Sequence, residues 1–577
     1  MRRTKIVCTL GPACEDEDLL RQMMRNGMNV ARFNFSHGDF EEHGNRVEKI
    51  RRLSKEENVN VALLLDTKGP EIRTGKFEGG KVHLEQGSEV IIRHDDILGN
   101  AHEFSCTYKT LHEDVKPGDV IMVDDGLIEL DVTKIEDKDV YTEVRNGGPV
   151  STYKGMNLPG IETNLPALTD KDRADLEFGV ENNYDFVAAS FIRKASDVEE
   201  IRRFFAERGD TDIKIISKIE NQEGVDNFEE ILAASDGIMV ARGDLGVEVP
   251  SEKVPAYQKY MLRRCKEEGK FSITATQMLD SMESHPRPTR AEVSDVANAV
   301  YDGTGAVMLS GESANGDYPA ESVAMLDRIT RETEKNLDYR ANFELSRTYL
   351  PTVQTAVAEA AVEAGMELEA DAYVMVSDNI NEIAQVMKYH PYAPIVVGTT
   401  RDKVLRQAGL LWDVYPVLIE ESDPEAMYDA VKKYAEEKEL IADGSAVVEL
   451  RYTPENEHLD AFRVSQYSKR EALKGEGHGR HDAVGTVVNL KELDSDCFDL
   501  DELMTYEDLV LVADEFTEED LPLVRFAIAL VQESAEMNPV LDRAIDKNKP
   551  VVTDVKNATA DLNTGDFVTV SSEGTIK

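Results

Sequence analysis

The sequence has few cysteines and no long apolar run, and both absences narrow the classes of protein it can belong to. Its five cysteines, Cys8, Cys14, Cys106, Cys265 and Cys497, show no Cys-x-x-Cys pair and no regular spacing. We therefore expect neither a disulfide framework nor a zinc knuckle. We expect the protein to work in a reducing cell interior. No stretch approaches the ~18 apolar residues that a membrane-spanning helix needs, and the basic first residues lead into no signal-peptide core. We expect a soluble cytoplasmic protein without a membrane partner.

Basic residues are also scarce. The chain has 65 Lys and Arg against 112 Asp and Glu, which gives a net charge of −47. Nucleic acids and anionic membranes gain affinity from Lys and Arg, so neither is expected as a partner. The acidic excess is spread along the chain, which favours a surface adapted to a salt-rich cytoplasm over an ordinary acidic protein. In 1 M salt the Debye length is only ~3 Å, so self-repulsion costs little.

Short apolar runs alternate with amphipathic segments in the first third of the chain and again between residues 170 and 335. Such runs are typical of buried strands, and a helix between most of them is typical of β/α units. Eight runs predict an α/β fold whose main domain, residues 1–69 and 160–340, is a closed (β/α)8 barrel. The predicted strands are residues 5–10, 30–35, 61–66, 186–190, 213–218, 237–241, 272–276 and 306–310.

Other regions of the chain differ from the barrel in residue composition and in their pattern of strands and helices. Residues 70–159 are rich in β-branched residues and turn signals, which predicts an inserted all-β domain that serves as a lid over the barrel. Residues 350–470 alternate strand and helix patterns and predict an α/β domain with a mainly parallel sheet. Residues 475–480, with three glycines, are expected to form a flexible join. Residues 483–577 predict a small extra α/β domain.

Polar residues follow almost every predicted barrel strand, and the carboxyl ends of barrel strands form the active face. Lys218 and Glu220 point to one face of their strand, because strand side chains alternate. Asp244 comes directly behind Arg242 and Gly243. Two carboxylates can hold a hard divalent cation, with Lys218 and Arg242 beside it as phosphate partners. Any one of the polar clusters that follow the predicted strands is more often a plain salt bridge or helix cap. Six such clusters at equivalent strand ends, however, indicate a metal-assisted site for a phosphoryl or carboxylate group.

Several long motifs, in order, closely resemble those of pyruvate kinase. The resemblance is dense over residues 1–335 and looser over residues 350–460. The motifs are Met28-Asn-Val-Ala-Arg-Phe-Asn-Phe-Ser-His-Gly38, Leu65-Asp-Thr-Lys-Gly-Pro-Glu-Ile-Arg-Thr-Gly75, Lys154-Gly-Met-Asn-Leu-Pro-Gly160, Ile216-Ser-Lys-Ile-Glu-Asn221, Val240-Ala-Arg-Gly-Asp-Leu-Gly246 and Met308-Leu-Ser-Gly-Glu-Ser313.

The resemblance implies transfer of a phosphoryl group from phosphoenolpyruvate to ADP, which gives pyruvate and ATP. It implies that Glu220 and Asp244 hold Mg²⁺ or Mn²⁺ and that Lys218 stabilises the transferring group. The positions that match catalytic or substrate-binding residues are Arg32, Arg73, Lys218, Arg242, Gly243, Asp244, Thr276 and Ser310. Those that match nucleotide-binding residues are Asn34, His37, Arg73 and Lys154. Thr276 and Ser310 lack a suitable free pKa, so a relay through water is expected to protonate the enolate.

The resemblance also implies a K⁺ site and an assembly. Asn34, Ser36, Asp66 and Thr67 match the family's monovalent-cation ligands, and all four offer oxygen. Family members with an acid at the position of Glu71 need K⁺, whereas those with lysine carry their own cation. The family's tetramers imply a homo-oligomer.

Two regions depart from the family. Its members often bind a sugar-phosphate effector through a Ser/Thr/Gly-rich loop, but here the matching loop carries Asp378 and no glycine. The family's closing Gly/Thr-rich segment is also missing, and residues 452–458 stand near its place. Parts of residues 549–570 resemble a swivelling phosphohistidine domain, yet no histidine follows His481. A structural role is therefore expected for residues 483–577.

Two rival functions remain open from the sequence. One is a metal-dependent lyase or aldolase that acts on a pyruvate enolate with the same barrel. It would not need the β insertion, Lys154 or the cation residues, and all of these are present. The other is a non-catalytic homologue, which loss of Lys218, Glu220 or Asp244 would mark, and none is lost.

Overall fold

A computed structural model describes residues 2–347, 352–451, 459–467, 473–493 and 508–576. The chain forms two compact units, which are taken separately below. Unit 1 comprises Met1–Ile441 and Ala446–Ser465, and unit 2 comprises Ala442–Ser445 and Gln466–Lys577. Within the described residues, no helix is both long enough and apolar enough to cross a membrane.

Unit 1 is built on the predicted closed barrel of eight parallel strands, in the order β1-β17-β16-β15-β14-β13-β3-β2. The strands coincide with the predicted runs to within about two residues at each end, because most residues of each run are apolar and buried. They are β1 (Lys5–Thr9), β2 (Val30–Asn34), β3 (Ala62–Asp66), β13 (Phe186–Ala189), β14 (Lys214–Ile219), β15 (Gly237–Ala241), β16 (Phe271–Ala275) and β17 (Ala306–Leu309).

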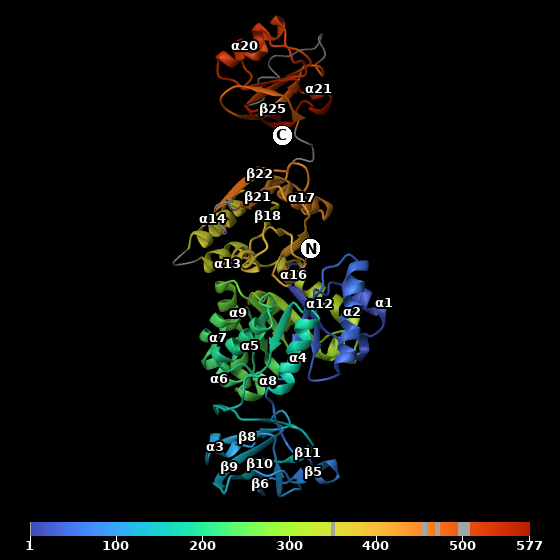
Figure 1. The fold of residues 1–577 in the computed structure, drawn as a ribbon, viewed down its shortest axis with the longest axis vertical. Coiled ribbons are helices and arrows are strands. Elements are labelled where there is room, and N and C mark those ends of the chain that lie inside the picture. Colours follow the sequence, from blue (N-terminus) through green and yellow to red (C-terminus); the bar gives the residue numbers. More distant parts are fainter. Residues whose placement is uncertain (1, 348–351, 452–458, 468–472, 494–507, 577) are drawn as a thin grey trace. The chain divides into compact units, whose positions relative to one another are not determined.

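Helices ring the barrel strands, and Figure 1 shows several of them outside the barrel. Their apolar faces and the outward faces of the strands form one continuous core. Four of them, α1, α2, α4 and α10, begin at a side-chain cap. At the start of α4, for example, Thr169 and Asp172 form a capping box. The ring comprises α1 (Glu17–Arg25), α2 (Phe40–Glu56), α4 (Asp170–Glu181), α5 (Ala195–Glu207), α7 (Phe228–Ala234), α9 (Val254–Glu268), α10 (Arg290–Tyr301) and α12 (Pro319–Glu334).

The insertion of residues 70–159 is a β domain with its own apolar core. Its main sheet runs β4-β12-β8-β9-β10-β6-β7, and β5 pairs with β11 beside it. The strands are β4 (Ile72–Arg73), β5 (Lys81–Leu84), β6 (Glu89–Arg93), β7 (Glu103–Ser105), β8 (Val120–Val123), β9 (Ile128–Glu136), β10 (Asp139–Asn146), β11 (Gly148–Ser151) and β12 (Gly155–Asn157), with a short helix α3 (Leu111–Asp114).

The third part of unit 1 is the predicted α/β domain. Its sheet runs β20-β19-β18-β21-β22, with parallel pairing from β20 through β21. The strands are β18 (Ala372–Val376), β19 (Ile395–Thr399), β20 (Val414–Leu418), β21 (Ala446–Arg451) and β22 (Ala461–Gln466), and the helices are α13 (Tyr339–Ser346), α14 (Val353–Glu367), α15 (Ile380–Met387), α16 (Asp402–Ala408) and α17 (Pro424–Glu437). The segment 452–458, noted for its missing Gly/Thr-rich character, lies outside the described residues.

Unit 2 contains a mixed sheet in the order β23-β30-β29-β25-β26-β27-β28-β24. Four neighbouring strands at its centre, β25 to β28, are parallel. The strands are β23 (Leu473–Lys474), β24 (Glu476–His478), β25 (Ala483–Asn489), β26 (Leu509–Ala513), β27 (Ala529–Gln532), β28 (Val551–Thr553), β29 (Phe567–Val570) and β30 (Thr575–Ile576), and the helices are α19 (Leu521–Val524), α20 (Pro539–Asp546) and α21 (Ala558–Asp561).

The glycine-rich segment 475–480 differs from the expected flexible join. Its residues Glu476–His478 form β24, which pairs with β28. A Cβ on Gly477 would lie 2.3 Å from the Gly574 nitrogen, and one on Gly475 would lie 2.3 Å from the Thr553 carbonyl oxygen. These glycines therefore allow close packing of backbones. The extra domain accordingly includes residues before the expected start at 483.

Candidate functional site

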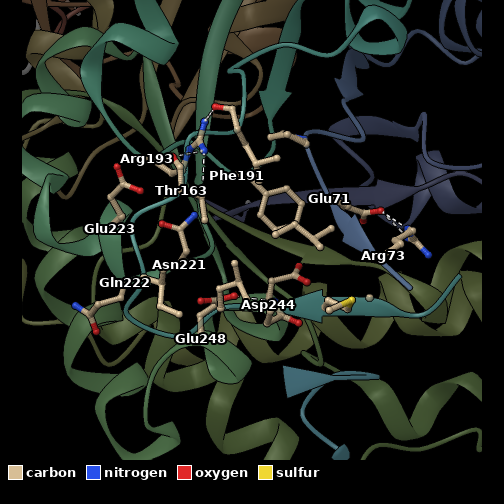
Figure 2. A pocket seen from close by; sticks show the side chains of 18 of the residues that line it. Glu71, Arg73, Thr163, Phe191, Arg193, Asn221, Gln222, Glu223, Asp244 and Glu248 are labelled. Carbon is tan, nitrogen blue, oxygen red and sulfur yellow. Dashed lines mark hydrogen bonds and ion pairs between the residues drawn. The ribbon is translucent and has the colours of Figure 1, made fainter. Parts of the chain in front are cut away.

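A cavity of about 260 Å³ lies in unit 1, where the β insertion meets the carboxyl ends of the barrel strands. Among the predicted site residues, Glu71, Arg73, Lys154 and Asp244 line it. Figure 2 shows Glu71 joined to Arg73, and Asp244 near Glu248. The other lining residues include Asp124, Asp125, Asn157, Thr163, Phe191, Arg193, Asn221, Gln222 and Glu223.

A buried network of charges joins three barrel strands at the same end. Arg32, the middle residue of β2, donates through Nε to Asp66 Oδ2 at 2.7 Å. Lys218 of β14 donates through Nζ to Asp66 Oδ1 at 3.1 Å and lies 2.9 Å from Glu220 Oε1. Arg32 also donates to the Thr9 hydroxyl at 2.8 Å. The topology thus brings residues from four strands together around two cations and two carboxylates.

The charges in this network hold each other ionised. Burial alone would lower the pKa of Lys218, but Asp66 and Glu220 outweigh it and raise that pKa. Burial alone would raise the pKa of Asp66, but Arg32 and Lys218 outweigh it and lower that pKa. Lys218 therefore remains a fixed positive charge at the base of the site, which suits the stabilisation of an anion.

The ionised form of Glu220 is stabilised less than those of Lys218 and Asp66. Burial raises its pKa to about 7, Lys218 opposes this shift, and the charge of Asp244 adds to it. Its Oε2 accepts from the Phe191 amide at 2.7 Å. Its Oε1 is buried and lies 2.9 Å from the Lys218 ammonium, which is its one charged contact among the described residues. A buried carboxylate oxygen of this kind fits a cation ligand.

Asp244 supplies the second carboxylate of the predicted metal site. It lies in the first turn of α8 (Arg242–Glu248), which begins at Arg242 as predicted, and it faces the cavity. Across the described ranges, no group of three or more His, Cys, Asp or Glu is arranged to hold a metal. The carboxylates of Glu220 and Asp244 are the ligand type that a hard divalent cation prefers, and Mg²⁺ often takes its other oxygen ligands from substrate and water.

The Arg242 side chain, predicted as a phosphate partner, is engaged by groups of the protein, so that role stays a prediction. Its Nε donates to the Ala275 carbonyl at 3.0 Å and its Nη2 to the Thr276 carbonyl at 2.7 Å. Asp295 holds the same guanidinium at 2.7 Å. Thr276 has a positive φ of 73°, which is costly for a β-branched residue. The structure therefore gives Arg242 the task of holding this strained turn, because its fork suits two adjacent carbonyls.

Thr276 packs directly on the start of α8. A Cβ on Gly243 would lie 2.9 Å from the Thr276 methyl carbon, so only glycine permits this approach. Ser310 follows β17, and its amide donates to Glu312 Oε2 at 2.7 Å. Glu312 Oε1 also accepts from the Leu279 amide at 3.0 Å. The motif around Ser310 thus ties the last barrel strand to the loop after β16.

The residues predicted for K⁺ are only partly brought together. Asn34 and Asp66 are register partners on β2 and β3, and Asn34 Oδ1 accepts from the Ser36 amide at 3.1 Å. Thr67 accepts from the Ser190 amide at 3.1 Å. The Asp66 carboxylate, however, is engaged by Arg32 and Lys218. The K⁺ site therefore stays a prediction.

The predicted nucleotide-facing residues fall into two groups. The Glu71 carboxylate holds Arg73 at 2.6 Å, and Lys154 lies 2.8 Å from Asp124 Oδ1, so both cations are paired at the cavity wall. His37 is exposed outside the cavity lining, and its carbonyl oxygen contacts a ring nitrogen of His43 at 2.9 Å. The nucleotide role of the His37 side chain stays a prediction.

Sequence reasoning missed several residues that build the site. Ser190, which accepts from Lys218 at 2.8 Å, follows a predicted strand and was detectable by the same rule as the other clusters. Glu248 lies four residues after Asp244, which is one helical turn, and was also detectable by spacing. The Phe191 amide was not, because a backbone donor leaves no mark in the sequence.

Comparisons with known proteins agree along the whole chain. The family model described as pyruvate kinase, barrel domain, matches residues 1–323, and the model described as pyruvate kinase, alpha/beta domain, matches residues 355–465. A pyruvate kinase of Staphylococcus saprophyticus is 41% identical over 99% of this chain and 98% of its own length. One of Geobacillus stearothermophilus is 42% identical over 99% and 97%. A solved pyruvate kinase of Cryptosporidium parvum has a TM-score of 0.78 and 38% identity, and covers 81% of this chain and 96% of its own.

Proposed function

The chain belongs to the pyruvate kinase family and is a phosphotransferase, and from this premise we propose how its residues transfer a phosphoryl group from phosphoenolpyruvate to ADP. The observation that carries the proposal is the buried network of Arg32, Asp66, Lys218 and Glu220 beside a cavity lined by Arg73, Lys154 and Asp244. Phosphoryl transfer needs positioning and charge stabilisation more than covalent help, and this arrangement offers both.

Lys218 stabilises the phosphoryl group in transit. Its ammonium is fixed by Asp66, Ser190 and Glu220, so no reorganisation is needed when charge shifts between donor and acceptor oxygens. Arg32, held by Asp66 from the neighbouring strand, binds the phosphate of phosphoenolpyruvate from the other side.

Glu220 and Asp244 are the residues that would hold Mg²⁺ or Mn²⁺. When bound, such an ion neutralises negative charge on the substrate oxygens. The donor chemistry fits, because both groups are carboxylates and Glu220 Oε1 has only the Lys218 ammonium near it among the described residues. Asn34, Ser36, Asp66 and Thr67 are proposed to hold K⁺.

Arg73 and Lys154 orient the nucleotide phosphates, with Asn34 and His37 as further contacts. Both cations come from the β insertion, and each is paired with a carboxylate, Glu71 or Asp124, that stops it from collapsing onto Asp244. A lyase that acts on an enolate would have no use for this pair of cations at the cavity wall.

Thr276 and Ser310 stand where the enolate is protonated. Neither hydroxyl is acidic enough to act alone, so each positions water that delivers the proton. The amides of Arg242, Gly243 and Asp244 open α8 toward the cavity and bind the substrate carboxylate.

We also infer the setting in which the enzyme works. The net charge of −47 supports a surface adapted to high salt, and the four cysteines in the described residues are free and buried, which supports a reducing cytoplasm. A homotetramer is the assembly proposed from the family.

Release of pyruvate from phosphoenolpyruvate and ADP, measured in molar KCl with Mg²⁺, tests the function. We expect turnover that needs both substrates and yields one ATP for each pyruvate. Release of pyruvate without ADP would contradict the proposal, because it would indicate hydrolysis or bond cleavage in place of transfer.

A further inference from the structure

Glu248 lines the cavity, but it has no role in the mechanism proposed above. It ends α8, one helical turn after Asp244, and its carboxyl group faces the cavity beside Asp244 (Figure 2). Burial raises its pKa to about 7, while a side-chain hydrogen bond from Asn157 and a backbone one from Leu158 oppose the shift. A buried acid with two donors from one segment is built to hold that segment.

The segment that Glu248 holds is the return of the chain from the β insertion to the barrel. Asn157 is the last residue of β12, and its Nδ2 donates to Glu248 Oε1 at 2.8 Å. The contact therefore joins the insertion to the helix that carries Asp244. It is a side-chain bond across the cavity, between residues 91 positions apart.

Asn157 fixes β12, which is the second strand of the insertion's main sheet. β12 lies between β4 and β8, and its register pairs Gly155 with Arg73 and Asn157 with Met122. Lys154 precedes β12 directly, and its amide donates to Thr74 Oγ1 at 2.9 Å. The hydrogen bond from Asn157 to Glu248 therefore fixes the positions of both Arg73 and Lys154.

A second anchor holds the same return segment farther along. Arg193, on the loop after β13, donates to Thr163 Oγ1 at 2.9 Å and to the Leu165 carbonyl at 2.6 Å. Gly160 lies between the two anchors with a φ of 71°. The Arg193 anchor fixes the barrel end of the segment, so Glu248 is the anchor that governs the insertion end.

We propose that Glu248 is a positioning residue that fixes the return strand of the insertion, and through it Lys154 and Arg73, relative to Asp244. The inference rests on the proposed function, because it takes Lys154 and Arg73 as groups that face the nucleotide. It predicts that loss of the Glu248 carboxyl group harms nucleotide binding selectively, whereas a merely structural acid would harm stability or all kinetic constants together.

Kinetics of Glu248→Ala test this, with Glu252→Ala as the matched control on the exposed turn after α8. We expect the KM for ADP to rise about tenfold, since a hydrogen bond to a charged group is worth about that factor. The KM for phosphoenolpyruvate and the Tm should stay near those of the control. Glu248→Gln should recover part of the loss, because its amide oxygen still accepts from Asn157.

Asn157→Ala provides a second variant that leaves the acid in place. Combined with Glu248→Ala it should cost no more than the larger single change, because both remove one interaction. Equal effects on both substrates, or full additivity, would overturn the proposal.

Hydrogen exchange separates failure of this inference from failure of the proposed function. The amides of residues 154–158 should exchange faster in Glu248→Ala than in Glu252→Ala, whether or not the wild type turns over phosphoenolpyruvate. Unchanged exchange there would overturn the anchor itself.

Discussion

In both units, polar residues follow the ends of parallel strands. The two units differ in how completely these polar residues hydrogen-bond to one another. In unit 2, Thr559 donates to Glu533 through its amide at 2.7 Å, and its hydroxyl lies 2.9 Å from Asp514. Asn489 Nδ2 contacts the carbonyls of Thr559 and Leu562, each at 2.7 Å. These residues bond to one another around α21, and the Asn489 Nδ2 group and the amide and hydroxyl of Thr559 each have a partner.

The strand ends of unit 1 are left incomplete. Glu220 Oε1 is buried with only the Lys218 ammonium near it among the described residues, and Phe191 and Asn221, which lie next to Glu220, line the cavity. Such an arrangement costs stability, and proteins keep it where a ligand or transition state supplies the missing partner. The difference teaches that polar residues at strand ends indicate a site only when their bonding is left open.

The largest effect should come from removing the charge at the centre of this open site. Lys218→Met should lower kcat by at least about 10²-fold, because one preorganised group aimed at developing charge is worth ~3 kcal/mol. Asp244→Asn should do the same. The matched control is Lys171→Met, which removes a lysine paired with buried Asp175 at 2.8 Å on the outer helix α4. Folding of each variant is checked by circular dichroism; near wild-type kinetics in folded Lys218→Met would remove Lys218 from the mechanism.

A smaller effect should follow exchange of the monovalent cation. At equal ionic strength, KCl should support a rate at least about tenfold above NaCl, because one missing cation beside phosphates costs ~1.4 kcal/mol or more. Glu71→Lys should reduce that ratio by supplying an ammonium. It should also raise the KM for ADP, because Glu71 holds Arg73 at 2.6 Å.

Glu78→Lys is the control for this charge change, since Glu78 is exposed in the same β domain. Equal rates in the two salts would refute the specific site and leave only general salt stabilisation.

The sequence predicted the barrel and the third domain because their strands are apolar runs that parallel sheets bury on both faces. It predicted the cluster of Lys218, Glu220 and Asp244 because strand ends meet at one edge. It did not reveal that the Arg242 guanidinium binds the carbonyls of the strained Thr276 turn, because backbone acceptors leave no mark in the sequence. It was wrong about the join at 475–480, because glycine suits both flexible chains and backbones in close contact.

A modest effect is expected at the loop that carries Asp378. Its carboxylate accepts from the Thr400 amide at 2.8 Å and from the hydroxyls of Thr399 and Thr400. These are the donors that a phosphate would need. Fructose 1,6-bisphosphate should therefore change the half-saturation for phosphoenolpyruvate by less than about twofold, because the donors are already used.

Asp378→Ala should free those donors and increase the response to the sugar, whereas Asp402→Ala, on the next helix, should not. A large drop in the half-saturation for phosphoenolpyruvate on adding the sugar to the wild type would contradict this prediction. It would show that the hydrogen bonds of Asp378 do not prevent the sugar from binding.

The smallest effect on chemistry should come from unit 2, in whose described residues the polar groups around α21 are paired with one another. The boundary at Gln466 matters here, because it assigns His478 and His481 to the unit. A ring nitrogen of His478 contacts Thr553 Oγ1 at 3.1 Å on the neighbouring strand, and so it is committed to the sheet. Incubation with labelled phosphoenolpyruvate should leave no acid-labile phosphate on residues 466–577, and truncation after Tyr467 should change kcat by less than about twofold while lowering stability or altering assembly. A stable phosphoryl group trapped on either histidine, and lost in His478→Gln or His481→Gln, would show that the strand edge of unit 2 carries chemistry after all.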